Sequence, residues 1–354
     1  MMMVVVVAAG LGAESAGAAE TEPAQIRAAV KKALPLIEKS AGEYVRQKQC
    51  FSCHHQALPM LAMVTARKRG FEIDEKELAG QVKFTAESLG RSREAYREGR
   101  GQGGQATTAG YGLWALELGG RKGDETTSAV VEYLVGWQKE LGHYRPQTKR
   151  PPSEGSEFTP TYVALRGMRS FGGAEQKERI AERMETIRRW VQETPGRDTE
   201  DRVFRLWALR LAGVEGEKLE AAKQELVETQ RDDGGWAQTE EMESDAYATG
   251  SALFVLQEAG GVAVSDPVYQ RGMAYLVRSQ QTDGSWLVKT RSRPVQTYFE
   301  SGFPHGKDQF ISMMATSWAT AALAAGCANE SERAAGAAEV DHSGLEQRSP
   351  NARP

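Results

Sequence analysis

Apolar residues recur at helical spacing through most of this chain, and they fall into two kinds of segment. The clearest segment of the first kind is an amphipathic helix that is expected to end at Gln280, followed by a turn through Gly284 that leads to Trp286. The same plan recurs in residues 132–144 (Leu134, Gln138, Gly142 and Tyr144) and in residues 223–236 (Leu226, Gln230, Gly234 and Trp236).

Segments of the second kind carry small and bulky apolar residues nearly all round the helix, and each stops at glycine. They cover residues 104–120, 159–173, 199–213, 244–261 and 308–326. A helix that is apolar on all sides is buried on most of them. Strand signals are almost absent, and a helix pair that repeats cannot bury its apolar face alone, so the pairs are expected to stack.

The segment Arg271–Trp286 resembles the repeat of the squalene cyclases and the related prenyltransferase-type α/α toroids. The resemblance extends over roughly residues 80–326 and implies an all-α fold, with a single toroid of helical hairpins over residues 24–327. It also implies that outer helices carry the glutamine at their C-terminal end and that inner helices line a central cavity. The glutamine amide is suited to satisfy free backbone groups at the helix end.

The sequence Cys50-Phe51-Ser52-Cys53-His54 has the spacing that attaches a c-type haem. The two thiols can add to one porphyrin, and His54 can offer an imidazole nitrogen to the iron. Three other interpretations stay open: half of a zinc site, a redox dithiol, and a structural disulfide. The following residue, His55, is expected to lie at the surface or to support a ligand from behind.

The haem motif is expected to form the turn of the first hairpin, residues 24–70. Equivalent turns of stacked hairpins cluster at one end of a toroid, so His143 and His305 are expected at the same end as His54. His305, in the long loop before the last helix, is our main candidate for a second iron ligand. It competes with His143, with Met60 and Met63, which have the spacing of core residues, and with an open position.

A cluster of acidic residues precedes one of the apolar helices. Squalene-cyclase-like enzymes carry Asp-x-Asp-Asp in such a place, and the middle carboxyl protonates the substrate; here the residues are Asp198, Glu200 and Asp201. Such an acid must stay protonated, whereas Arg202 and Arg205 would lower the pKa of Glu200. We therefore interpret the cluster as a helix cap and predict no catalytic residue.

Two further observations weigh against enzyme chemistry of the related families. The chain has about half the length of the two-barrel cyclases that it resembles. The zinc ligands of the farnesyltransferase-like enzymes find no matching set, because the one remaining thiol, Cys327, lies near the end of the final helix.

The composition and the two terminal segments limit where the protein can be located and which partners it can have. The net charge of −4, with mixed signs along the 354 residues, gives no basic face for nucleic acid. Residues 1–18 have the short apolar run and small residues of a signal peptide, so export to the periplasm or beyond is expected, although no basic residue precedes Arg27. No stretch reaches transmembrane length, and residues 328–354 are expected to be a disordered tail.

The leading hypothesis is an exported toroid that carries haem c on Cys50, Cys53 and His54 for electron transfer or redox sensing. Its partner would then be a redox protein. The alternative is a terpene cyclase-like or isoprenoid-binding toroid whose cavity takes a small molecule and whose cysteines are structural. A third possibility is an interaction scaffold.

Overall fold

The fold was examined in a computed structural model that describes residues 22–294 and 297–328. The signal peptide expected for residues 1–18 lies outside the described residues, as does the expected tail apart from Ala328. Among the helices that are described, none combines the length and apolar character needed to cross a bilayer.

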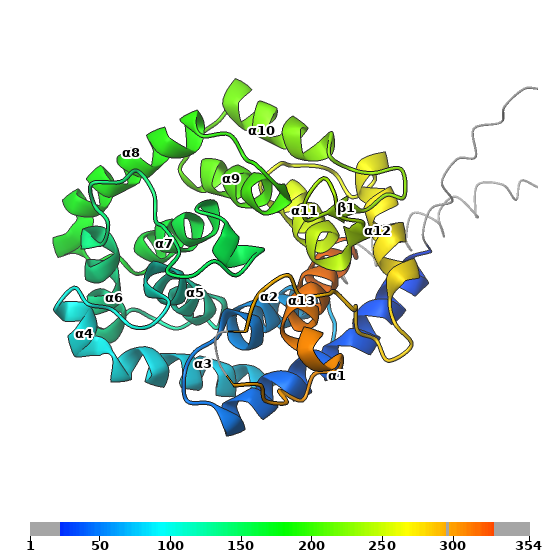
Figure 1. Cartoon of the computed structure of the whole chain (residues 1–354), viewed down its shortest axis with the longest axis horizontal. Coiled ribbons are helices and arrows are strands. Elements are labelled where there is room, and N and C mark those ends of the chain that lie inside the picture. Colours follow the sequence, from blue (N-terminus) through cyan, green and yellow to red (C-terminus); the bar gives the residue numbers. More distant parts are fainter. Residues whose placement is uncertain (1–21, 295–296, 329–354) are drawn as a thin grey trace, which may run out of the picture.

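Twelve main helices form two concentric rings (Figure 1). The outer ring contains α1 (Pro23–Gln47), α3 (Glu75–Arg91), α6 (Glu125–Gly136), α8 (Lys177–Glu193), α10 (Glu217–Val227) and α12 (Pro267–Ser279). The inner ring contains α2 (Leu58–Lys68), α5 (Gln105–Leu118), α7 (Phe158–Phe171), α9 (Thr199–Leu211), α11 (Ala246–Glu258) and α13 (Gln309–Ala325). The predicted all-α toroid is therefore confirmed.

Short elements fill the turns between the rings. They are α4 (Arg93–Arg97), the π-helix η1 (Cys53–Ala57) and the 3-10 turns η2 (Ser153–Gly155), η3 (Ala174–Gln176) and η4 (Gly306–Asp308). The strands β1 (Trp236–Ala237) and β2 (Ser244–Asp245) pair antiparallel, with Trp236 opposite Asp245. This two-residue ladder closes the turn between α10 and α11.

The two kinds of helix differ in burial as the hydrophobic pattern predicts. Outer helix α12 buries a single stripe, which consists of Tyr269, Gly272, Met273 and Leu276. Inner helix α13 buries all but one of its residues from Gln309 to Ala325, since neighbours surround it on every side. Burial of a complete inner ring supplies the apolar core that no single hairpin could form.

The aromatic residue that closes each repeat bonds back to its own outer helix. Trp236 Nε1 donates to the Leu226 carbonyl, and Trp286 Nε1 donates to the Leu276 carbonyl, both at 2.9 Å. In the third copy, the Tyr144 hydroxyl donates to the Leu134 carbonyl at 2.5 Å. Each aromatic ring therefore satisfies a carbonyl that the helix end would leave free.

Two of the three repeat glutamines connect neighbouring hairpins. Gln230 Nε2 donates to the Gly234 carbonyl in its own turn and to the Val268 carbonyl at the start of α12. Gln280 Nε2 donates in the same way to the carbonyls of Gly284 and Ala29, each at 2.9 Å. Because Ala29 belongs to α1, the last repeat closes the ring onto the first helix.

The toroid has two distinct ends. We call the end at which the inner helices begin the N-terminal rim; the turns that lead from outer to inner helices all lie there, including those with His54, His143 and His305. The opposite end carries the glycines that follow inner helices: Gly70, Gly120, Gly173, Gly213 and Gly326. Gly70, Gly120 and Gly213 have a positive φ, between 71° and 74°, which ends a helix without strain in glycine.

Candidate functional site

Glu200 lies on the first turn of α9, at the N-terminal rim. Asp198 caps this helix by accepting a hydrogen bond from the Asp201 amide at 3.0 Å, so the cap that the sequence predicts is present. Glu200 itself points inward and is 3% exposed. Thr159 Oγ1 donates to one carboxyl oxygen at 2.7 Å, and the Tyr247 hydroxyl donates to the other at 3.0 Å.

Burial raises the pKa of Glu200 to about 8. The neighbouring carboxyls of Asp198 and Asp201 raise it further, whereas the hydrogen bonds from Thr159 and Tyr247 lower it. Because the desolvation of a fully buried carboxyl outweighs two hydrogen bonds here, Glu200 is mostly protonated at neutral pH.

The expected effect of the nearby arginines on Glu200 is wrong. Neither Arg202 nor Arg205 is among the main causes of the pKa shift of Glu200, and the shift is upward. The Arg205 guanidinium turns toward the outer ring, where it pairs with Glu225 at 2.7 Å and donates to the Val191 carbonyl at 3.1 Å. A helix presents successive residues to different sides, so residues five apart need not share an environment.

The partners of Glu200 escaped the sequence analysis, although a signal for them exists. Thr159, Glu200 and Tyr247 are each the second residue of an inner helix, namely α7, α9 and α11. Phe310 has the same place in α13. Aligning the repeats by helix start would therefore have placed these residues at one level of the N-terminal rim.

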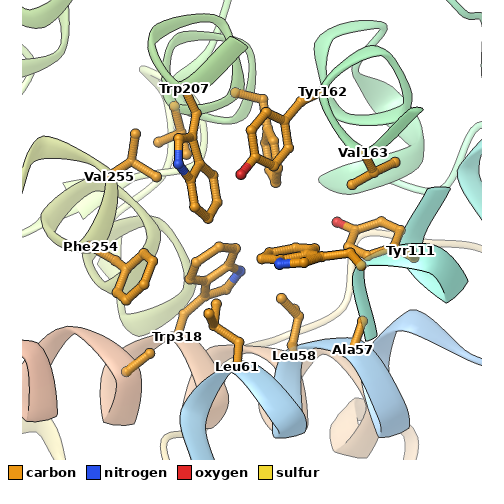
Figure 2. Packing of buried hydrophobic residues seen from close by; sticks show 14 of the residues in the cluster. Ala57, Leu58, Leu61, Tyr111, Tyr162, Val163, Trp207, Phe254, Val255 and Trp318 are labelled. Carbon is orange, nitrogen blue, oxygen red and sulfur yellow. The ribbon is translucent and has the colours of Figure 1, made fainter. Parts of the chain in front are cut away.

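The centre of the inner ring is occupied by aromatic side chains (Figure 2). Tyr162 stacks on Trp207 at 4.4 Å between ring centroids, and Trp207 lies 6.1 Å from Trp318. Phe254 contacts both tryptophans, at 5.7 and 5.8 Å. These residues come from α7, α9, α11 and α13, so the aromatic cluster spans the ring from one side to the other.

The Cys50–His54 segment forms a second candidate site at the same rim. Cys50 is exposed, Cys53 is half-buried, and both are free thiols. Cys53 begins the π-helix η1, a local geometry that is frequent at functional sites. Phe51 anchors the turn, because its backbone N–H donates to Ser88 Oγ on α3 at 3.1 Å.

The two histidines of this turn contact each other through their Nδ1 atoms, which are 2.5 Å apart. His55 is completely buried and stacks on Tyr44 at 4.8 Å. Its expected surface position is therefore wrong, while its contact with His54 fits a supporting role. Burial lowers the pKa of His54 to about 3, so its ring is neutral at pH 7.

Three polar atoms beside the motif are buried without a hydrogen-bond partner in the described structure: Ser52 Oγ, His55 Nε2 and Gln56 Nε2. Aromatic rings also lie beside this motif, since the ring centroids of His54 and Phe310 are 5.0 Å apart. Unsatisfied buried polar groups cost free energy, and these three come from one turn of the chain.

The other iron-ligand candidates have contacts or burial of their own. Nε2 of His305 is hydrogen-bonded to Ser285 Oγ at 2.7 Å, a bond that iron ligation would have to replace. His143 stacks on Trp190 at 4.6 Å, and Met60 and Met63 are fully buried core residues of α2. Within the described residues, no hydrogen bond or aromatic ring contact joins His54 to His305.

The two candidate sites border each other. Burial and the carboxylate of Glu154 raise the pKa of Cys53 to about 12. Burial raises the pKa values of Tyr111 and Tyr247, and both tyrosines are also influenced by Cys53 and by Glu200. The thiol and the buried acid therefore both lie near these two tyrosines.

Comparison with known proteins shows the fold alone. No protein-family model matches the sequence, and no curated protein matches it. Among solved structures, the type II terpene cyclase MstE from Scytonema superposes with a TM-score of 0.55 at 13% identity, over 86% of this chain and 98% of that chain. A protein from Actinoplanes gives a TM-score of 0.55 at 14% identity, over 85% of this chain and 99% of that chain.

Another MstE structure, a complex with its substrate geranylgeranyl dihydroxybenzoate, has a TM-score of 0.52 at 11% identity, with 86% of this chain and 98% of that chain covered. Because 98% of the MstE chain is covered, a type II terpene cyclase can have the length of this single toroid. The described chain has the α/α toroid fold that is also found in type II terpene cyclases.

Proposed function

We propose that this toroid binds an apolar, unsaturated small molecule of the isoprenoid class at its centre and protonates it from Glu200. The observation that carries this proposal is the buried Glu200 carboxyl, whose pKa of about 8 keeps it in the acid form. With a pKa one unit above neutrality, about nine in ten such carboxyls hold their proton at pH 7. The fold that this chain shares with the type II terpene cyclase MstE supports the same proposal.

The proposed step moves one proton. The O–H bond of Glu200 breaks, a C–H bond forms at one carbon of a ligand double bond, and the positive charge remains on the ligand. Thr159 and Tyr247, which donate to the two carboxyl oxygens, stabilise the carboxylate left behind. The faces of Trp207 and Trp318 stabilise the cation until it loses a proton to solvent and a new double bond forms. A bound ligand would have to separate aromatic rings that contact one another in this structure.

The test uses deuterium as a label for the donated proton. Wild-type protein is incubated in heavy water with squalene, geranylgeraniol or a geranylgeranyl aromatic acid, and products are analysed by mass spectrometry. We expect one deuterium on carbon in an isomerised or cyclised product. Glu200→Gln should still quench tryptophan fluorescence on ligand binding but yield no labelled product, because the amide has no acidic proton to give.

Glu220→Gln is the matched control, since Glu220 is an exposed carboxyl that pairs with Lys223 on outer helix α10. It should label the product as the wild type does. Equal labelling by Glu200→Gln would show that another group is the acid. Failure of every ligand to bind would overturn the proposal as a whole.

We further propose that Cys50 and Cys53 attach haem c and that His54 is its proximal ligand in an exported protein. The donor set fits the group: two free thiols and a neutral imidazole lie in one turn, beside buried polar atoms that lack partners. The Nδ1 contact with His55 orients the His54 ring and leaves Nε2 for iron. Bound haem would supply one-electron transfer at the N-terminal rim.

Covalent haem is tested by a pyridine haemochrome spectrum and an intact mass after expression with periplasmic haem-attachment machinery. We expect the mass of one haem in the wild type, at most one thioether in Cys53→Ala, and an altered spectrum in His54→Ala. Cys327→Ala, which changes the third cysteine at the far end of α13, should keep the haem. A wild-type mass without haem, while a control cytochrome matures, would contradict the proposal.

A further inference from the structure

The described structure contains four fully buried tryptophans, and they fall into two pairs. Trp236 and Trp286, in the turns between the rings, each donate their indole N–H to a leucine carbonyl. Trp114 and Trp318, in the inner ring, have no hydrogen-bond partner for Nε1. Among these four tryptophans, the two in the turns are therefore satisfied and the two in the inner ring are not; Nε1 of the partly buried Trp137, at the end of outer helix α6, also lacks a partner.

A third unsatisfied donor lies beside them. The Tyr111 hydroxyl is fully buried and has no partner in the described residues, and its ring is 5.8 Å from that of Trp114. Trp114 contacts Trp207 at 5.4 Å, and Trp207 contacts Trp318 at 6.1 Å. Figure 2 shows the Tyr111 oxygen and the Trp318 nitrogen directed toward the middle of the cluster. The three donors therefore belong to one connected aromatic cluster.

The chemistry of these groups restricts what can partner them. An indole N–H only donates, so its partner must be an acceptor. The nearby guanidinium of Arg166 is a donor as well, and it is already bound to Glu117 and to the Tyr162 hydroxyl. A buried donor that stays unpaired costs free energy, and a hydrocarbon ligand would leave all three donors unpaired.

We infer that the central site takes an oxygenated isoprenoid, one that presents a hydroxyl, carbonyl or carboxyl oxygen to Tyr111, Trp114 and Trp318, in preference to a pure hydrocarbon. This inference rests on the proposed function, because it assumes that the centre admits a ligand. Apolar side chains around the donors, such as Leu58, Leu61 and Phe254, receive the hydrocarbon part (Figure 2).

The experiment compares two ligands of the same chain length: geranylgeraniol and the hydrocarbon in which its C–OH is replaced by C–H. Dissociation constants are measured by tryptophan fluorescence with the Glu200→Gln variant, in which no turnover interferes. We expect the alcohol to bind about tenfold more tightly, as one satisfied buried donor predicts. Trp114→Phe and Trp318→Phe should each reduce this preference to about threefold or less.

Trp207→Phe is the matched control. Trp207 belongs to the same cluster, but its nitrogen is not one of the buried atoms without a partner. Its replacement should weaken both ligands alike and keep their ratio, with folding checked by circular dichroism. Equal binding of alcohol and hydrocarbon would overturn the inference and show that water satisfies the donors. If neither ligand binds, the proposed function itself fails.

Discussion

Replacing Glu200 with glutamine is expected to stabilise the protein at alkaline pH, by an amount that grows between pH 4.5 and about pH 8. In the folded wild type the carboxyl keeps its proton up to a pKa of about 8, whereas the unfolded chain loses it near the ordinary value of 4.5. Between these values the folded state binds more protons than the unfolded state, so the free energy of unfolding falls as pH rises.

Each pKa unit corresponds to about 1.4 kcal/mol, so the wild type loses about 5 kcal/mol through this one group across that interval. The free energy of unfolding is not reduced below the Glu200 pKa of the unfolded chain, and it is fully reduced above the Glu200 pKa of the folded protein. Glutamine does not titrate, so Glu200→Gln should escape the loss while it keeps an oxygen for Thr159 or Tyr247.

Denaturant unfolding of both proteins at several pH values measures this difference. A difference in unfolding free energy that stays constant from pH 4.5 to above pH 8 would show that the Glu200 pKa is not raised. Tyr247→Phe should raise the pKa of Glu200 in the folded state, because it removes a hydrogen bond that lowers this pKa. The loss of unfolding free energy with rising pH should then continue to a higher pH than in the wild type. Glu220→Gln controls for the removal of one exposed carboxyl.

Trp286→Ala is expected to destabilise the toroid by about 3–5 kcal/mol, the range for truncating a buried tryptophan. Trp286 is 1% exposed and binds the end of α12, beside the Gln280 contact that closes the ring onto α1. Its loss leaves both a cavity and a free Leu276 carbonyl at the junction of the last and first hairpins.

Thermal and denaturant unfolding measure the effect, and two variants separate its causes. Trp286→Phe keeps most of the packing but loses the bond to Leu276, so it should cost less, about 1 kcal/mol for the hydrogen bond. Leu287→Ala changes the next residue, which is 44% exposed, and should stay within about 0.5 kcal/mol of the wild type. A Trp286→Ala protein as stable as Leu287→Ala would show that the repeat aromatic does not hold the ring.

The sequence by itself determined the helices and their order. Amphipathic segments became outer helices and uniformly apolar segments became inner ones, because the helical period decides which side of each helix must be buried. The glutamine, glycine and aromatic residues of Arg271–Trp286 indicated the toroid, because they satisfy helix ends through contacts within one repeat and its neighbour. These are local relations, and spacing along the chain expresses them.

The chemistry of the N-terminal rim was decided by the tertiary structure. Glu200 has a raised pKa because α7 and α11 bury it, and Thr159 and Tyr247 come from those helices. Spacing suggested that Arg205 would oppose this shift, but the packing of α9 turns Arg205 toward the outer ring.

The same holds for His55, which was expected either at the surface or behind a ligand. The packing of α1 against η1 buries it. The pKa of a carboxyl and the exposure of an imidazole depend on distances to groups from other hairpins. These distances are set when the hairpins pack into the closed ring, so they cannot be predicted from a local sequence pattern.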